Sequence, residues 1–243
     1  MSDYLIVFIL TFCIRIISVM VGGGRMVLLP LLIIIVGLDP SVALATMKTG
    51  GLSSSFSLIK FHKHKQVNWV MWRTMTPWVV AGAFIGSYLV VIIDQDLFKK
   101  LIGISVLLSL IVLLTKRNKG KRDKQVLDTN IGIVPRFLSS IAGLLGALFG
   151  FKGVFMRYWY VSRGLTFIEA TATNKATSLI ANIVAVISFI VFGLVNWPFA
   201  VTMFVAGGLG SWFGAHIGMK VGNVWVERLF ALVVAASVVK LFL

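Results

Sequence analysis

Acidic residues and cysteine are the scarcest chemical groups in this sequence. Asp and Glu together number 8 of 243 residues, against 23 Lys and Arg, and the single cysteine, Cys13, lies in an apolar stretch. One cysteine excludes an internal disulfide framework and a thiolate metal cluster. The apolar segments hold no pair of carboxylates, which argues against acid/base hydrolysis and against a proton relay of Asp and Glu. Glu169, just before a polar helix in the second half, is the one arguable exception.

Charged residues of either sign are also few, at 13% of the chain, whereas hydrophobic residues make up 58%. A soluble domain would carry about a quarter charged residues. The length leaves room for about six to eight membrane crossings of roughly 20 residues each. The formal charge of +15 does not indicate nucleic acid, because many of the cations fall in two runs typical of cytoplasmic loops, 60–65 and 116–124. We therefore predict an all-α, multi-pass protein of a bacterial-type inner membrane, with the lipid bilayer as its surroundings.

The two halves of the chain are related in sequence. Gly37-Leu38 and Ala45-Thr46-Met47-Lys48 return in the same order as Gly164-Leu165 and Ala172-Thr173-Asn174-Lys175. Asn68-Trp69 returns as Asn196-Trp197, and the pair Gly82 and Gly86 returns as Gly210 and Gly214. We predict a first transmembrane repeat over 1–115, a basic cytoplasmic linker over 116–130 and a second transmembrane repeat over 131–243. The paired glycines are typical of faces on which membrane helices pack.

Each repeat opens with an apolar element that a glycine-bearing break interrupts. The breaks are Gly22-Gly23-Gly24-Arg25, between segments 4–21 and 26–37, and Gly150-Phe151-Lys152-Gly153, between segments 132–149 and 153–163. Non-helical backbone at membrane depth is tolerated only where protein buries it or where it lines a cavity. We interpret each as a broken or re-entrant element. Three full spans follow the broken element in each repeat, at 41–60, 69–93 and 97–115 in the first and at 166–192, 197–219 and 225–243 in the second. With the two broken elements, this gives about eight hydrophobic elements in total.

Three spans per repeat is an odd number, which favours repeats of inverted orientation. Basic residues follow the first span of repeat one, at Lys60, Lys63 and Lys65, but its counterpart 193–197 has no charge. Three of the four corresponding loops differ in charge as inversion predicts, and the fourth is ambiguous. This orientation places loops 60–66, 116–130 and 220–228 in the cytoplasm and both termini outside.

Each repeat carries a lysine deep in an apolar stretch, Lys48 and Lys175. A lysine inside a membrane helix costs about 2.5–3.5 kcal/mol on insertion scales. One interpretation is that each lysine snorkels or binds carbonyls freed by a helix break. The other is that the two lysines face each other across a pseudo-twofold axis and bind an anion. Nearby hydroxyl and amide groups would suit an oxyanion, namely Thr46, Thr49, Thr173 and Asn174.

The breaks are a second candidate site for an anion, through the backbone at Gly23 and Gly24. Helix ends at a break expose N–H groups, and the positive end of the helix dipole favours negative charge there. Arg25 and Lys152 align with each other inside the two breaks, and Arg157, which aligns with Pro30, adds another cation.

Together these features resemble the TauE/SafE family of sulfite and organosulfonate exporters over essentially the whole chain. The resemblance rests on the glycine-rich break before Pro30, on Gly-Leu followed by Ala-Thr-x-Lys in each half, and on the small-residue faces. It implies transport of small sulfur-containing anions of the sulfite, sulfonate, sulfoacetate or thiosulfate type. The chain departs from the pattern in its second break, where Phe149, Phe151 and Lys152 replace most of the glycines and Arg157 replaces the proline. Such added positive charge suits a more highly charged or bulkier anion.

We expect a small anionic substrate near the membrane midplane, and alternating access as one repeat rocks or slides against the other. A passive anion channel is an alternative. An intramembrane enzyme acting on an anionic lipid or headgroup is a weaker one, because no nucleophile with a base in reach is evident. We expect no enzymatic activity, no metal and no cofactor, and leave a homodimer open.

Overall fold

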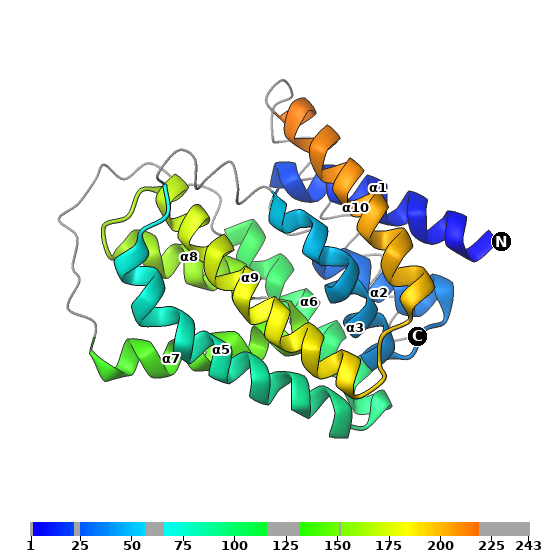
Figure 1. The fold of residues 1–243 in the computed structure, drawn as a ribbon, viewed down its shortest axis with the longest axis horizontal. Coiled ribbons are helices and arrows are strands. Elements are labelled where there is room, and N and C mark those ends of the chain that lie inside the picture. Colours follow the sequence, from blue (N-terminus) through cyan, green and yellow to red (C-terminus); the bar gives the residue numbers. More distant parts are fainter. Residues whose placement is uncertain (1, 22–24, 57–65, 116–131, 151, 219–243) are drawn as a thin grey trace. The chain divides into compact units, whose positions relative to one another are not determined.

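The computed structural model describes residues 2–21, 25–56, 66–115, 132–150 and 152–218, and these ranges are helical with no strand. The predicted all-α class is therefore confirmed for the described ranges. The predicted linker 116–130 and last segment 225–243 lie outside them. The helices are α1 (Ser2–Val21), α2 (Arg25–Val36), α3 (Pro40–Gly50), the 3-10 helix η1 (Gly51–Phe56), α5 (Trp69–Ile92), α6 (Gln95–Thr115), α7 (Ile133–Phe149), α8 (Lys152–Ser162), α9 (Phe167–Val191) and α10 (Trp197–Gly218) (Figure 1).

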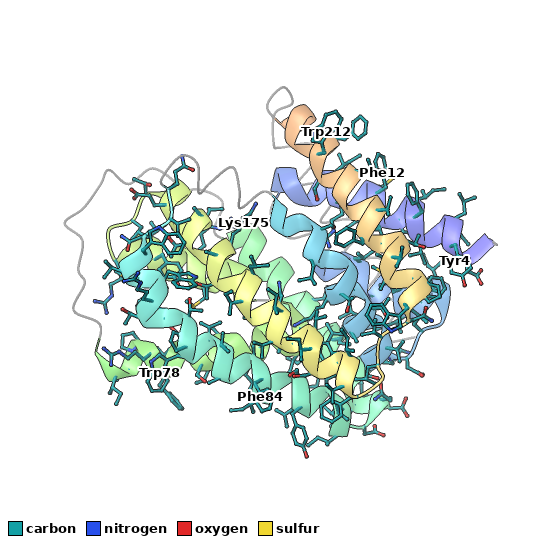
Figure 2. The ribbon with its side chains drawn as sticks, viewed as in Figure 1. Tyr4, Phe12, Trp78, Phe84, Lys175 and Trp212 are labelled. Atoms are coloured by element: carbon teal, nitrogen blue, oxygen red, sulfur yellow. The ribbon has the colours of Figure 1, made fainter. Side chains whose placement is uncertain are left out.

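Two helices of the described ranges are long and apolar enough to cross a membrane, Trp69–Ile92 and the stretch Glu169–Val191 of α9. Several large apolar side chains on the helices stay exposed: Phe84 of α5 is 59% exposed and Trp212 of α10 is 68% exposed (Figure 2). The opposite face of α5 is a buried stripe at every fourth residue, Met71, Met75, Val79 and Ala83. One buried and one exposed apolar face on the same helix suit protein on one side and lipid on the other.

The predicted segment 41–60 is divided in the structure. α3 ends at Gly50, and the N–H of Gly51 donates to the carbonyl oxygens of Met47 and Thr49 before the chain continues as η1. Two adjacent glycines each cost about 1 kcal/mol in a helix, which favours an end here. The corresponding residues of the second repeat are Thr177 and Ser178, and α9 runs through them without interruption.

The chain forms two compact units that do not coincide with the two sequence repeats. The first unit contains Met1–Ser54, Ile93–Thr115 and Ile190–Leu243, and the second contains Ser55–Ile92 and Lys116–Phe189. Helix α5, from the first repeat, therefore belongs to the second unit with α7, α8 and α9. Helix α10, from the second repeat, belongs to the first unit with α1, α2 and α3. Among the described helices, each repeat therefore has one helix in the unit that holds the other repeat's first helix; we call α5 and α10 the exchanged helices.

The exchanged helices pack through the paired glycines. A Cβ added to Gly86 would lie 2.7 Å from the carbonyl oxygen of Leu144 in α7, and one added to Gly214 would lie 2.7 Å from that of Ile16 in α1. Their partners one turn earlier, Gly82 and Gly210, approach the same two helices as closely. Figure 1 shows α1 beside α10. The prediction that these glycine faces pack helices is confirmed, since only glycine lets the backbones approach this far.

Candidate functional site

Equivalent hydrogen bonds attach each exchanged helix to the helix that carries a predicted lysine. In the first unit, the backbone N–H of Asn196 donates to Oγ1 of Thr46 at 3.0 Å. In the second unit, the N–H of Asn68 donates to Oγ1 of Thr173, also at 3.0 Å. Both threonines are fully buried. In each case the asparagine of one repeat therefore donates its backbone N–H to the threonine of the other repeat.

The asparagine of each Asn-Trp pair also begins its helix. Oδ1 of Asn68 accepts from the N–H of Met71 at 3.0 Å, and Oδ1 of Asn196 accepts from the N–H of Phe199 at 3.3 Å. A side-chain oxygen that satisfies an early N–H group of a helix is a favourable N-cap. The side chain of each asparagine thus caps the exchanged helix, and its backbone N–H links that helix to the threonine of the lysine-bearing helix.

Each lysine points away from the exchanged helix of its unit. Thr46 and Gly50 contact α10, and Lys48 lies two residues from either, about 200° around α3. In the second unit Thr173 and Thr177 contact α5, the latter through a hydroxyl pair with Thr76 at 3.1 Å, and Lys175 lies between them in sequence. Figure 2 shows the Lys175 side chain leaving α9 on the side away from α5.

The donors predicted around the lysines are therefore divided between faces. The hydroxyls of Thr46 and Thr173 lie on the packing face, and the hydroxyl of Thr49 donates to the carbonyl oxygen of Ala45 at 2.9 Å within its own helix. Asn174, the residue before Lys175, is 4% exposed. The hydroxyls of the two buried threonines thus each accept a backbone N–H group, on a helix face other than that of the neighbouring lysine.

The environments of the two lysines differ. Lys48 is 7% exposed and lies in the last turn of α3, where the negative end of the helix dipole favours a cation by about 0.3–1 kcal/mol, and by up to about 2 in partly buried positions. That is less than the cost of about 2.5–3.5 kcal/mol for a lysine inside a membrane helix. Lys175 is half-buried in the interior of α9, far from a helix end. The helix end thus accounts for part of the cost at Lys48 and for none at Lys175.

The two predicted breaks precede helices that begin with the aligned cations, Arg25 in α2 and Lys152 in α8. Gly150 ends α7 in the left-handed conformation, with φ of 74°, and its N–H donates to the carbonyl oxygen of Gly146 at 3.1 Å. Glycine adopts this conformation without strain, which explains its place at the break. Arg157 lies partly buried in α8. Gly23 and Gly24 lie outside the described residues.

Sequence reasoning missed a buried cation in α1. Arg15 is 4% exposed and stands in the apolar run of that helix. The signal was the same as for the lysines, a lone cation in an apolar segment. Arg15 was not considered because the candidate cations were those that recur in both repeats, and the corresponding positions of the second half hold Ala142 and Gly143.

Glu169 has a local role. Its Oε2 accepts from the N–H and the hydroxyl of Thr166, both at 2.9 Å, and its own N–H donates to Oγ1 of Thr166 at 3.3 Å. This reciprocal pair is a capping box at the start of α9. Within the described ranges, no group of three or more His, Cys, Asp or Glu could hold a metal ion.

Comparison with known proteins covers nearly the whole chain. A family model described as sulfite exporter TauE/SafE matches residues 7–241. A probable membrane transporter protein, ORF9, of Sinorhizobium sp is 27% identical over 241 residues, 96% of this chain and 90% of the relative. The probable membrane transporter protein YfcA of Escherichia coli K12 is 26% identical over 226 residues, 90% of this chain and 82% of the relative. One from Haemophilus influenzae is 25% identical over 228 residues, 92% and 88% of the two chains. No solved structure matches the chain significantly.

Proposed function

Because the chain belongs to the sulfite exporter TauE/SafE family and is a membrane transporter, we propose that it moves small sulfur-containing anions across a bacterial inner membrane by alternating access. The substrates are of the sulfite, sulfonate, sulfoacetate or thiosulfate type. The cations that we propose to bind the anion are Lys48 and Lys175. Arg25, Lys152 and Arg157, at and after the helix breaks, attract it.

The observation that carries this proposal is the equivalent position of the two lysines. In each unit the face of the helix opposite the lysine is attached to the exchanged helix, through Thr46 in one case and Thr173 in the other. Such attachment fixes the rotation of the helix about its axis and so the direction of the lysine. Burying a charged side chain in a membrane helix is costly, and this chain does so at both equivalent positions with the same orientation. This favours a role for the lysines in ligand binding over a role in packing.

The helix directions within each unit support inverted repeats. In the first unit, Phe12 and Ile16 of α1 meet Gly210 and Gly214 of α10 in the same order, so these two helices run in parallel. In the second unit, α5 runs parallel to α7 by the contacts of its glycines, and parallel to α9 by its two threonine contacts.

Residues 192–196 join α9 to α10, and successive spans joined so briefly cross a bilayer in opposite directions. This short connection supports the proposal that α1 and α7, the equivalent first helices of the two repeats, have inverted orientations. Such inverted repeats are common in transporters that alternate access around a central site.

Transport by the Lys48→Gln/Lys175→Gln double variant tests the proposal. We expect the wild-type chain in proteoliposomes to take up labelled sulfite, thiosulfate or sulfoacetate with saturable kinetics, and the double variant to lose uptake. Each lost charge-assisted hydrogen bond is worth about 1.5–3 kcal/mol, or about ten- to a hundredfold in affinity. The matched control is Lys99→Gln/Lys100→Gln in α6, which removes the same charge and should transport normally.

Two results would contradict this function. Wild-type rates in the double variant would show that the lysines do not bind the substrate. Flux that rises linearly with substrate, without saturation, would identify a passive anion channel instead of a transporter.

A further inference from the structure

Two side-chain donors of the second unit lack an acceptor. Nε1 of Trp72 in α5 and Nε of Arg136 in α7 are buried atoms, and neither has a hydrogen-bond partner among the described residues. The one carboxylate among the described residues of this unit, Glu169, is bound to Thr166 at the start of α9. A buried donor without an acceptor is destabilising, and more so when its group is charged. The two donors therefore favour an acceptor that the described chain does not supply.

The two donors lie at the same level of neighbouring helices. α5 and α7 run in parallel, and the hydroxyl of Ser139 contacts Sδ of Met75 between them at 3.1 Å. Trp72 precedes Met75 by three residues, and Arg136 precedes Ser139 by three residues. Because residues three apart are neighbours on a helix surface, both donors lie one turn before this contact, on the facing sides of the two helices. Each is the fourth residue of its helix.

The starts of α5 and α7 have the composition of a membrane–water interface. α5 is long and apolar enough to cross a membrane, and Trp69 and Trp72 in its first turn contact edge to face, with ring centroids 5.3 Å apart. Tryptophan is enriched where membrane helices meet the headgroups. The basic run 60–65 precedes α5 in sequence, and the basic run 116–124 precedes α7. Such runs are typical of the cytoplasmic side, where the lipid surface is negatively charged. The two donors therefore lie at the depth of anionic headgroups.

An exposed apolar face of α7 continues from Arg136 toward the interior of the membrane. Ile133, Phe137 and Ile141 follow one another at every fourth residue and are 74%, 62% and 40% exposed. Arg136 lies three residues after Ile133 and directly before Phe137, so it borders this face. A ligand with both an anionic group and hydrocarbon chains would contact the arginine and the apolar face together. A free inorganic anion would use only the arginine.

We propose that Arg136 and Trp72 bind the phosphate group of an anionic phospholipid, whose acyl chains lie along the exposed face of α7. The guanidinium is a planar fork of N–H donors that matches two oxygens of a phosphate. The indole N–H is a donor only, so it suits a further phosphate oxygen. The bound lipid joins the starts of α5 and α7. This site does not depend on which anion the protein transports.

Lipid binding to the full-length chain in detergent tests the site. Native mass spectrometry measures the affinities for phosphatidylglycerol, which is anionic, and for phosphatidylcholine, which has no net charge. We expect the wild-type chain to prefer phosphatidylglycerol. Arg136→Gln and Trp72→Phe each remove at least one hydrogen bond to a charged group, so each should weaken phosphatidylglycerol binding by about ten- to a hundredfold.

The matched control is Arg73→Gln, which removes the same charge from the same end of α5. Arg73 is exposed, and it lies two residues before Met75, about 200° around α5 from the side that contacts α7. We therefore expect Arg73→Gln to bind phosphatidylglycerol as the wild-type chain does.

Three results would overturn the site. Equal wild-type affinity for the two lipids would show no recognition of the anionic headgroup. Equal weakening by Arg136→Gln and Arg73→Gln would show that overall charge, and not a site, attracts the lipid. Displacement of phosphatidylglycerol by inorganic phosphate would identify a site for free oxyanions instead of a lipid. If Arg136→Gln does not fold, Trp72→Phe decides, because a tryptophan that only packs would leave the affinity for phosphatidylglycerol unchanged.

Discussion

Alanine substitutions along α10 measure how closely this exchanged helix approaches α1. In Gly210→Ala the new Cβ would lie 2.6 Å from the carbonyl oxygen of Phe12 and 2.9 Å from Cβ of Arg15, where ordinary contacts are 3.4–4 Å. The backbones must separate, and overpacking of this kind costs about 1–3 kcal/mol. The matched control is Gly208→Ala, whose new Cβ would meet only Cβ of Ser53, at 3.8 Å.

The comparison of the two variants isolates the packing cost. Both replace a glycine by alanine inside the same helix, and each gains about 1 kcal/mol of helix propensity. Gly208→Ala should therefore be as stable as the wild-type chain or more stable. Gly210→Ala should be less stable than Gly208→Ala by the full overpacking cost of about 1–3 kcal/mol. Tryptophan fluorescence during unfolding by SDS in mixed micelles gives both free energies. Equal stability of the two variants would refute the close packing of α10 against α1.

Two further predictions concern the repeated motifs and the topology. Thr46→Val and Thr173→Val each remove the acceptor of a partly buried backbone N–H, so each should lower the free energy of unfolding by about 1–3 kcal/mol in the same SDS assay and leave the affinity for sulfite unchanged. A loss of affinity at normal stability would instead place these hydroxyls at the substrate. In a background without Cys13, single cysteines at Gln66 and Leu194, which precede α5 and α10 at equivalent positions, should react with a membrane-impermeant maleimide from opposite sides of the membrane; labelling from one side would contradict inverted repeats.

Most helix ends were predictable because the signals that set them are local. α5 begins at Trp69 after an asparagine that caps it, and α7 ends at Phe149 before a left-handed glycine. The predicted segments 69–93 and 132–149 match these helices to within a residue. The end of α3 at Gly50 also has a local cause, but hydropathy alone does not register it, because glycine interrupts a helix without making the segment polar.

The exchange of helices was not predictable, because its cause is not local. The glycines of α5 and α10 indicate that some helix approaches each of them closely, and the sequence does not say which helix it is. The same holds for the donors around the lysines. Thr46 and Lys48 are near neighbours in sequence, but a separation of two residues places them on opposite faces once the segment is helical. The roles of Thr46 and Thr173 in anion binding stay predictions, to which the structure adds one backbone N–H accepted by each hydroxyl.

The exchange also changes which parts of the protein can move as rigid bodies. A sequence repeat is not a compact body here, because α5 is packed among helices of the second repeat and α10 among helices of the first. If one repeat slid against the other, the glycine contacts of Gly86 and Gly214 would have to break in every cycle. Movement of one unit against the other preserves all of these contacts. If the proposed transport cycle moves rigid bodies, these contacts favour the two compact units over the two sequence repeats as those bodies.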